Sequence, residues 1–221
     1  MPRQLPIDML NDSAKETVYI RKNQPLFKKL ARTTHFNLKE VEGLAVIHKK
    51  IRGEMGPVTI KVFRDIMHSG LDYTENIRHL LIDRVFSVID TRTSLQLPVD
   101  QWIEGLSIIL RGTLDERIKF AYTVYDQMRT NKIKKEQIFP MMRGCLIKLE
   151  GEGDLDEAVR DLIEMMLKTI DVDRDGKVDE DEFRIVVKRN PLVLECMGPV
   201  FPSREAQHTF LTTFTDQLGD F

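Results

Sequence analysis

The sequence predicts an all-α protein made of four helix–loop–helix units in two pairs, followed by a C-terminal helix. Three observations lead to this fold. Apolar residues recur at helical spacing from about residue 35 to about residue 189, and strand-like alternation never lasts beyond two or three residues. One twelve-residue segment has the acidic pattern of a metal-binding loop. The apolar pattern around this segment recurs three times upstream, at intervals of 36 to 45 residues, as tandem repeats do.

The first 34 residues are predicted to form a flexible N-terminal arm that contains one short helix. Residues 1–24 are polar, lack periodicity and include two prolines, which is typical of a mobile terminus. A short basic helix is expected at Pro25–Ala31. Asn37 and Glu40 then match a capping box, which predicts that the first long helix begins there.

The two pairs of helix–loop–helix units are predicted at residues 35–109 and 110–190. The helix that follows the capping box is expected from apolar residues at helical spacing, namely Val41, Leu44, Ile47 and Ile51. Further helices are expected at Ile77–Ser87, Leu114–Tyr125, Asp156–Thr169 and Asp181–Lys188.

The last unit contains the segment Asp171–Glu182, which matches the calcium loop of an EF-hand at each diagnostic position. Calcium takes about six to eight oxygen ligands, and short carboxylates at loop positions 1, 3 and 5 supply the first three. Gly176 permits the sharp turn at position 6, and Asp179 at position 9 is expected to act through a water molecule. The predicted metal ligands are Asp171, Asp173, Asp175, the carbonyl of Lys177 and both carboxylate oxygens of Glu182.

The EF-hand frame also requires apolar residues four positions before the loop and at loop positions 8, 13 and 17. Loops that start at Ile51, Asp90, Asp126 and Asp171 all meet this requirement. In chain order, these residues are Ile47, Val58, Phe63 and Met67; Phe86, Leu97, Trp102 and Leu106; Tyr122, Ile133, Ile138 and Met142; and Leu167, Val178, Phe183 and Val187. Paired EF-hands join through an antiparallel contact at position 8. The expected partners are Val58 with Leu97 and Ile133 with Val178.

The first three loops have lost the calcium ligands and are predicted to be structural. Position 12 of these loops holds Val62, Gln101 and Gln137, and none of these side chains offers a charged bidentate carboxylate. Arg92 in the second loop either substitutes for the metal charge beside Asp90 or is simply solvated, and we favour the second interpretation. One Ca²⁺ ion per chain is therefore expected, and the same ligands are compatible with Mg²⁺ at rest.

Residues 191–221 are predicted to form a C-terminal tail with an amphipathic helix at 203–218. The apolar face of this helix consists of Phe210, Leu211, Phe214 and Leu218. Two interpretations stay open: the helix covers the groove of the third and fourth hands and moves with calcium, or it is fixed and completes the core. Six of the ten methionines lie in that half, which suits either a partner-binding groove or plain core packing.

The composition and the motif search exclude several classes of function. Lys+Arg 33 against Asp+Glu 35 gives a net charge of −2, so the chain lacks the basic excess of a general nucleic-acid binder. No apolar run is long enough to cross a membrane, and the N-terminus shows neither a signal peptide nor a myristoylation site. Cys145 and Cys196 lack metal-binding spacing and are expected to be reduced intracellular thiols. No phosphate loop, HExxH or Gly-x-Ser-x-Gly motif is present, so we expect no catalytic residues, no organic cofactor and no enzyme activity.

Several segments resemble a known group of calcium-binding proteins. The run Trp102–Asp126 is similar to the segment that joins hands two and three in the neuronal calcium sensor and calcineurin B superfamily. Asp83–Phe86, Trp102–Ser107 and Leu194–Pro202 more closely resemble the EF-hand calcium sensors of ciliary and flagellar axonemes. This resemblance implies a location in the cytoplasm and cytoskeleton, at the axoneme. It also implies partners there: proteins of the outer dynein arm docking complex, dynein or the doublet microtubule.

The resemblance leaves two functions open. The first is a calcium-sensing adaptor of outer dynein arms, and the alternative is a calcineurin B-like regulatory subunit of a soluble enzyme. The axonemal sensors keep more than one usable loop, whereas this chain keeps one. The loss of the other loops favours a constitutive structural role over calcium-dependent docking.

Overall fold

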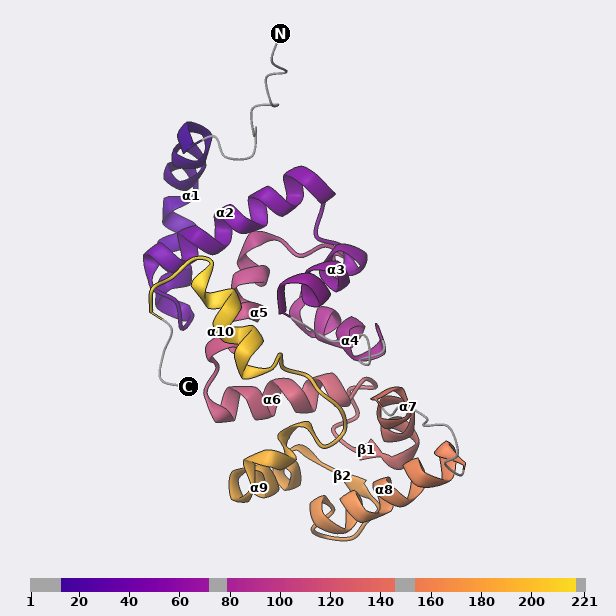
Figure 1. Ribbon diagram of the computed structural model, residues 1–221. Helices are drawn as coiled ribbons and strands as arrows, with labels where there is room; N and C mark the ends of the chain where they lie inside the picture. The colour runs from indigo at the N-terminus through magenta and orange to yellow at the C-terminus, as the bar shows by residue number, and fades with distance from the viewer. Residues whose placement is uncertain (1–12, 72–78, 146–153, 218–221) are drawn as a thin grey trace.

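The structure is a computed structural model that describes residues 13–71, 79–145 and 154–217. Within these ranges the chain forms ten α-helices, one 3₁₀ helix and one two-stranded sheet, which confirms the predicted all-α class (Figure 1). The elements are α1 Ser13–Thr33, α2 Leu38–Met55, α3 Ile60–Leu71, α4 His79–Ile89, α5 Val99–Arg111, α6 Leu114–Tyr125, β1 Ile133–Lys134, α7 Lys135–Cys145, α8 Leu155–Ile170, β2 Lys177–Val178, α9 Glu180–Arg189, η1 Pro191–Glu195 and α10 Arg204–Thr212. None of the described helices is both long and apolar enough to cross a membrane.

The helices expected inside the two pairs are confirmed, and their observed ends lie within two residues of the expected ends wherever the structure describes them. The capping box before α2 is also confirmed. The Asn37 side chain accepts a hydrogen bond from the Glu40 backbone N–H at 3.1 Å, and the Glu40 carboxylate accepts one from the Asn37 N–H at 2.8 Å. These helices follow local patterns of capping and apolar spacing, which is why the sequence predicts them well.

The N-terminal arm was predicted wrongly over residues 13–24, which are helical. α1 begins at Ser13 and continues through Pro25, where only a short helix was expected to start. Proline inside a helix removes a hydrogen bond and costs about 3 kcal/mol. Phe27 and Leu30 are 0% and 1% exposed, and burying each such side chain gains roughly 1.5–3 kcal/mol. Packing on α2 therefore offsets the proline, whereas residues 1–12 lie outside the described part.

The first loop was also predicted wrongly, because helix occupies the beginning of its frame. α2 continues to Met55, five residues into a loop that was expected to start at Ile51. Position 1 of this frame is an isoleucine, so no carboxylate is available there to accept backbone N–H groups and coil the chain. The expected contact at position 8 nevertheless forms, since the Leu97 N–H donates to the Val58 carbonyl at 2.9 Å.

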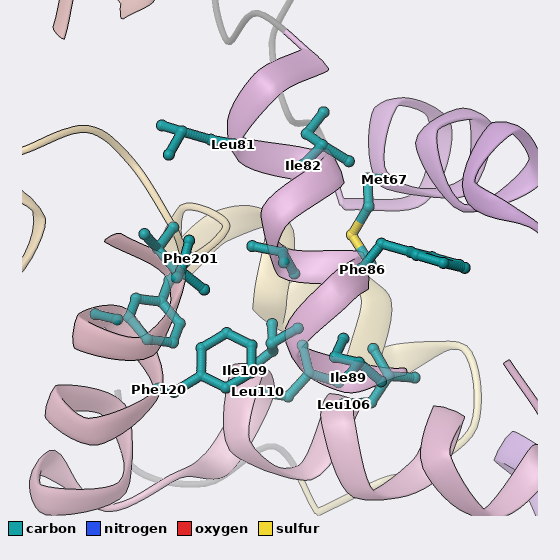
Figure 2. Packing of buried hydrophobic residues seen from close by; sticks show 14 of the residues in the cluster. Met67, Leu81, Ile82, Phe86, Ile89, Leu106, Ile109, Leu110, Phe120 and Phe201 are labelled. Atoms are coloured by element: carbon teal, nitrogen blue, oxygen red, sulfur yellow. The ribbon is translucent and has the colours of Figure 1, made fainter. Parts of the chain in front are cut away.

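The two pairs of hands share one hydrophobic core. Side chains from α4, α5 and α6 meet the segment that follows η1, and Figure 2 shows Phe86, Leu106, Phe120 and Phe201 among them. Trp102 of α5, which is 1% exposed, packs edge-on against Phe63 of α3 with 6.5 Å between the ring centroids. The second pair is closed by β1 and β2, which pair antiparallel with Ile133 opposite Val178, as predicted. The loops of the last two hands therefore lie side by side.

The C-terminal tail packs on the first pair of hands, whereas one interpretation placed it on the groove of the third and fourth. α10 contacts α3, and Phe210 faces Gly70 there. Phe214, just beyond α10, lies against Gly43 of α2 and meets the Phe36 ring with 6.0 Å between centroids. Phe210 and Leu211 are buried, so the tail completes the core on the first pair, and its being fixed with and without calcium stays a prediction. Leu218 lies outside the described residues.

The segment between η1 and α10 explains this placement. Phe201 packs on Phe120 of α6 with 6.0 Å between ring centroids, and the Arg117 guanidinium lies 4.2 Å from the Phe201 ring centre. The Tyr125 hydroxyl donates to the Gly198 carbonyl at 2.6 Å. Gly198 has φ of 130°, and a Cβ there would lie 2.7 Å from a Leu81 methyl carbon, so only glycine fits. These contacts carry the chain across α6 towards the first pair.

A buried carboxylate joins the tail to the first pair. Glu40 of α2 is 2% exposed, and Arg111 of α5 donates to its two oxygens at 3.1 and 2.9 Å. The Thr215 hydroxyl, which follows α10, donates to the same carboxylate at 2.7 Å. Burial raises the pKa of Glu40, but the hydrogen bonds from Arg111, Thr215 and Asn37 outweigh it and hold the pKa below its ordinary value of 4.5.

We expect Glu40→Gln to lower the free energy of unfolding at neutral pH by about 1.5–3 kcal/mol, which is typical of hydrogen bonds to a charged group. Because the folded-state pKa of Glu40 is depressed, its stabilisation is complete above the ordinary pKa of 4.5 and is lost as the pH falls through the lower folded-state value. Denaturant unfolding at several pH values should therefore show the two proteins converging in acid. Glu42→Gln, on the same helix, should have little effect, and a Glu40→Gln protein as stable as wild type at neutral pH would contradict the network.

Candidate metal centre

The loop from Asp171 to Glu182 has the backbone of a metal-binding coil. It connects α8 to α9, and two of its residues adopt left-handed conformations, Arg174 at φ 62° and Gly176 at φ 79°. These are loop positions 4 and 6. The two reversals wind the chain tightly, so that alternate side chains point towards the centre of the coil. Glycine takes this conformation without steric cost, which accounts for Gly176.

The three aspartates of the loop converge. Asp171, Asp173 and Asp175 each place one carboxylate oxygen within 4.8 Å of the others. Backbone N–H groups hold them there: the Asp175 N–H donates to Asp171 Oδ1 at 3.1 Å and to Asp173 Oδ1 at 2.9 Å, and the Gly176 N–H donates to Asp171 Oδ2 at 2.9 Å. Three carboxylates at this separation repel one another, and an oxygen-only donor set suits a hard divalent cation.

Glu182 turns its carboxylate back into the loop from the first turn of α9. It is 9% exposed, and its Oε1 accepts hydrogen bonds from the N–H groups of Val172 at 2.8 Å and Asp173 at 3.0 Å. Its Oε2 accepts from the Asp179 N–H at 3.1 Å, while the Asp179 side chain caps the Glu182 N–H at 2.9 Å. Glu182 therefore links the loop to the position of α9, which is the coupling that an EF-hand requires.

The residues fit a calcium ion. Asp171, Asp173 and Asp175 would hold it from the coil, and Glu182 is placed to close the site from the helix. The carbonyl of Lys177, which lies in β2, stays a predicted ligand. Asp179 acts as the N-cap of α9, and its predicted contact through water stays a prediction. The bound ion would offset part of the negative charge of the cluster and tie α9 to the loop.

A lysine from the neighbouring hand, which was not predicted as part of the site, also reaches it. Lys132 Nζ lies 2.8 Å from Asp175 Oδ2 across the loop pair. This hydrogen bond lowers the pKa of Asp175 and raises the pKa of Lys132. A signal was present in the sequence: Lys132 is position 7 of the third loop, next to the residue that pairs with Val178.

The second and third loops keep the same coil without its ligands. Each has left-handed residues at positions 4 and 6, namely Thr93, Leu95, Arg129 and Asn131. The position-1 carboxylates of Asp90 and Asp126 are buried, and each accepts hydrogen bonds from the backbone N–H groups at loop positions 5 and 6. Among the described residues, the only cluster of acidic, histidine or cysteine side chains that could hold a metal is that of the fourth loop. Arg92 is largely exposed and forms an ion pair with Asp100, so it does not replace a metal beside Asp90.

The fold and this site define an EF-hand protein of the calcium-binding class. Residues 115–188 match the model of the EF-hand domain pair. Calaxin of Xenopus laevis is 34% identical over 192 residues, which cover 84% of this chain and 91% of that protein. Calaxin of Danio rerio is 36% identical over 199 residues, covering 85% and 93%, and calaxin of Homo sapiens is 34% identical over 182 residues, covering 80% and 85%. The chain belongs to the calaxin family.

Proposed function

We propose that this protein is a calcium-binding adaptor of ciliary or flagellar axonemes, without catalytic activity. It associates with the outer dynein arm docking complex and regulates or stabilises dynein-driven motility. The proposed calcium binding rests on one observation, the convergence of three aspartate oxygens within 4.8 Å in the fourth loop. The axonemal part rests on membership of the calaxin family and on the motif resemblance at Trp102–Ser107 and Leu194–Pro202.

The surface of the calcium-binding half supports an adaptor. A cavity of about 460 Å³ opens between α7 and α8, with Phe139 and Ile163 in its lining. Leu162 and Met165 on α8 are 41% and 64% exposed. Exposed apolar side chains and an open cavity are both features of surfaces that bind partners. A calcium buffer has no need of such a surface.

Titration calorimetry should find one calcium ion per chain. Only the fourth loop brings metal ligands together within the described residues, so the other loops should contribute no binding. Sensor sites bind with dissociation constants of roughly 10⁻⁷–10⁻⁵ M, and we expect a value in or weaker than this range, since the paired loop adds no cooperativity. A second titration with magnesium tests occupancy at rest. Two or more tight calcium sites would contradict the structural role of the first three loops.

Fractionation of cilia tests the axonemal assignment. The protein should remain with axonemes after detergent removes the membrane, and should crosslink to proteins of the docking complex. Repeating the extraction with calcium and with chelator separates a calcium-dependent adaptor from a constitutive one. Recovery in the soluble fraction, bound to an enzyme, would instead favour the calcineurin B-like alternative.

A further inference from the structure

We propose that Lys132, in a loop that has lost its own ligands, sets the calcium affinity of the neighbouring loop. Its ammonium group acts as an internal counterion for Asp175, and a calcium ion has to displace it or bind beside it. This inference rests on the proposed calcium binding and goes beyond it, because it assigns a regulatory role to a residue outside the ligand set.

The pairing of the two loops fixes the position of Lys132. β1 and β2 are in register with Ile133 opposite Val178, and both residues are fully buried. Lys132 directly precedes β1, so its backbone is anchored beside the fourth loop, and its side chain has only to cross to Asp175. The two side chains are 47% and 32% exposed, so the ion pair lies at the rim of the site.

Both oxygens of Asp175 already have a hydrogen-bond donor. Oδ1 accepts from the Lys177 N–H at 2.9 Å, and Oδ2 accepts from Lys132 Nζ at 2.8 Å. A metal ion that binds this carboxylate must therefore take over or share an oxygen that has a donor. The positive charge of Lys132 at this distance also repels a divalent cation among the three aspartates.

The positive charge of Lys132 also stabilises the fourth loop in its metal-free state. Asp171, Asp173 and Asp175 crowd their oxygens together, and Lys132 also lies in the field of Asp173 and Asp179. A counterion in this position lessens the mutual repulsion of the carboxylates. Lys132 should thus have two opposite effects, stabilising the metal-free loop and weakening calcium binding.

The test compares Lys132→Gln with two matched variants of the full chain. Lys134→Gln removes the same charge from the same loop, and Lys134 forms no ion pair with the fourth loop among the described residues. Lys132→Arg keeps the charge. Calcium affinity is measured by calorimetry at low salt, and thermal unfolding is measured in the presence of a chelator.

We expect Lys132→Gln to bind calcium about two- to tenfold more tightly, and the difference should shrink at high salt, which screens exposed charges. In chelator, the same variant should unfold at a lower temperature than wild type. Lys132→Arg should stay near wild type, and Lys134→Gln should change either quantity less. Equal shifts in Lys132→Gln and Lys134→Gln, or no shift in either, would overturn this proposal alone. If the wild-type chain bound no calcium, the proposed function would fail as well.

Discussion

Glu182→Gln should lower the calcium affinity of the protein by roughly a hundredfold or more, because the site loses its one bidentate carboxylate. The metal-free loop should persist. The amide oxygen can still accept the hydrogen bonds from the Val172 and Asp173 N–H groups that the carboxylate accepts now. The variant does lose an acceptor for the Asp179 N–H, which costs about 1 kcal/mol at the start of α9. Calorimetry gives the affinity, and circular dichroism of the metal-free protein checks the fold.

The control for this variant is Asp181→Asn. Asp181 is the preceding residue in the same helical turn, its side chain is 83% exposed, and its charge is paired with Arg184 outside the loop. The two variants remove the same charge at nearly the same place. Near-normal calcium binding in Glu182→Gln would show that the proposed coordination is wrong. An equal loss in Asp181→Asn would show that net charge, and not ligation, sets the affinity.

Ile133→Asp should lower the free energy of unfolding by about 3–5 kcal/mol, since it places an uncompensated charge in the core. Ile133 is fully buried opposite Val178, whose carbonyl accepts a hydrogen bond from the Tyr122 hydroxyl at 3.1 Å. Calcium affinity should fall too, although Ile133 is no ligand, because the strand contact holds the fourth loop. Urea unfolding and calorimetry measure the two effects.

Ile133→Val is the matched control, and it should cost only about 0.5–1.5 kcal/mol while it keeps the strand contact. The defect of Ile133→Asp should also lessen in mild acid, since burial raises the pKa of a carboxyl and the neutral form costs less to bury. An Ile133→Asp protein with wild-type stability and calcium affinity would mean that the loops are not coupled through β1 and β2.

The parts of the fold that the sequence predicts correctly depend on neighbouring residues. The coil of the fourth loop is one example, because its alternating aspartates and Gly176 are local requirements of that coil. The capping box of Asn37 and Glu40 is another, as both hydrogen bonds span three residues. The pairing of Ile133 with Val178 joins distant residues, but it follows from the repeat, since position 8 has a known partner in every pair of hands.

The features that the sequence does not predict depend on contacts between distant residues. α1 persists through Pro25 because Phe27 and Leu30 find a buried place on α2, and no local pattern reveals that gain. The amphipathic pattern of the tail would suit burial on either pair of hands. Contacts of the preceding segment, such as that of Phe201 with α6, direct it to the first pair. Lys132 lies in a loop that lacks calcium ligands of its own. Its contact with Asp175 depends on the pairing of the third loop with the fourth.

The hydrogen bonds between the tail and the first pair of hands can form only late in the synthesis of the protein. Thr215 bonds Glu40 across a sequence separation of 175 residues, and Gln217 bonds Asn37 across 180. A ribosome that adds about 5–20 residues per second makes the tail roughly 10–35 seconds after the helix it will cover. During that interval the surfaces around Gly43 and Gly70 have no Phe214 or Phe210 to cover them. The N-terminal half of the protein is therefore synthesised first, but its packing is completed last.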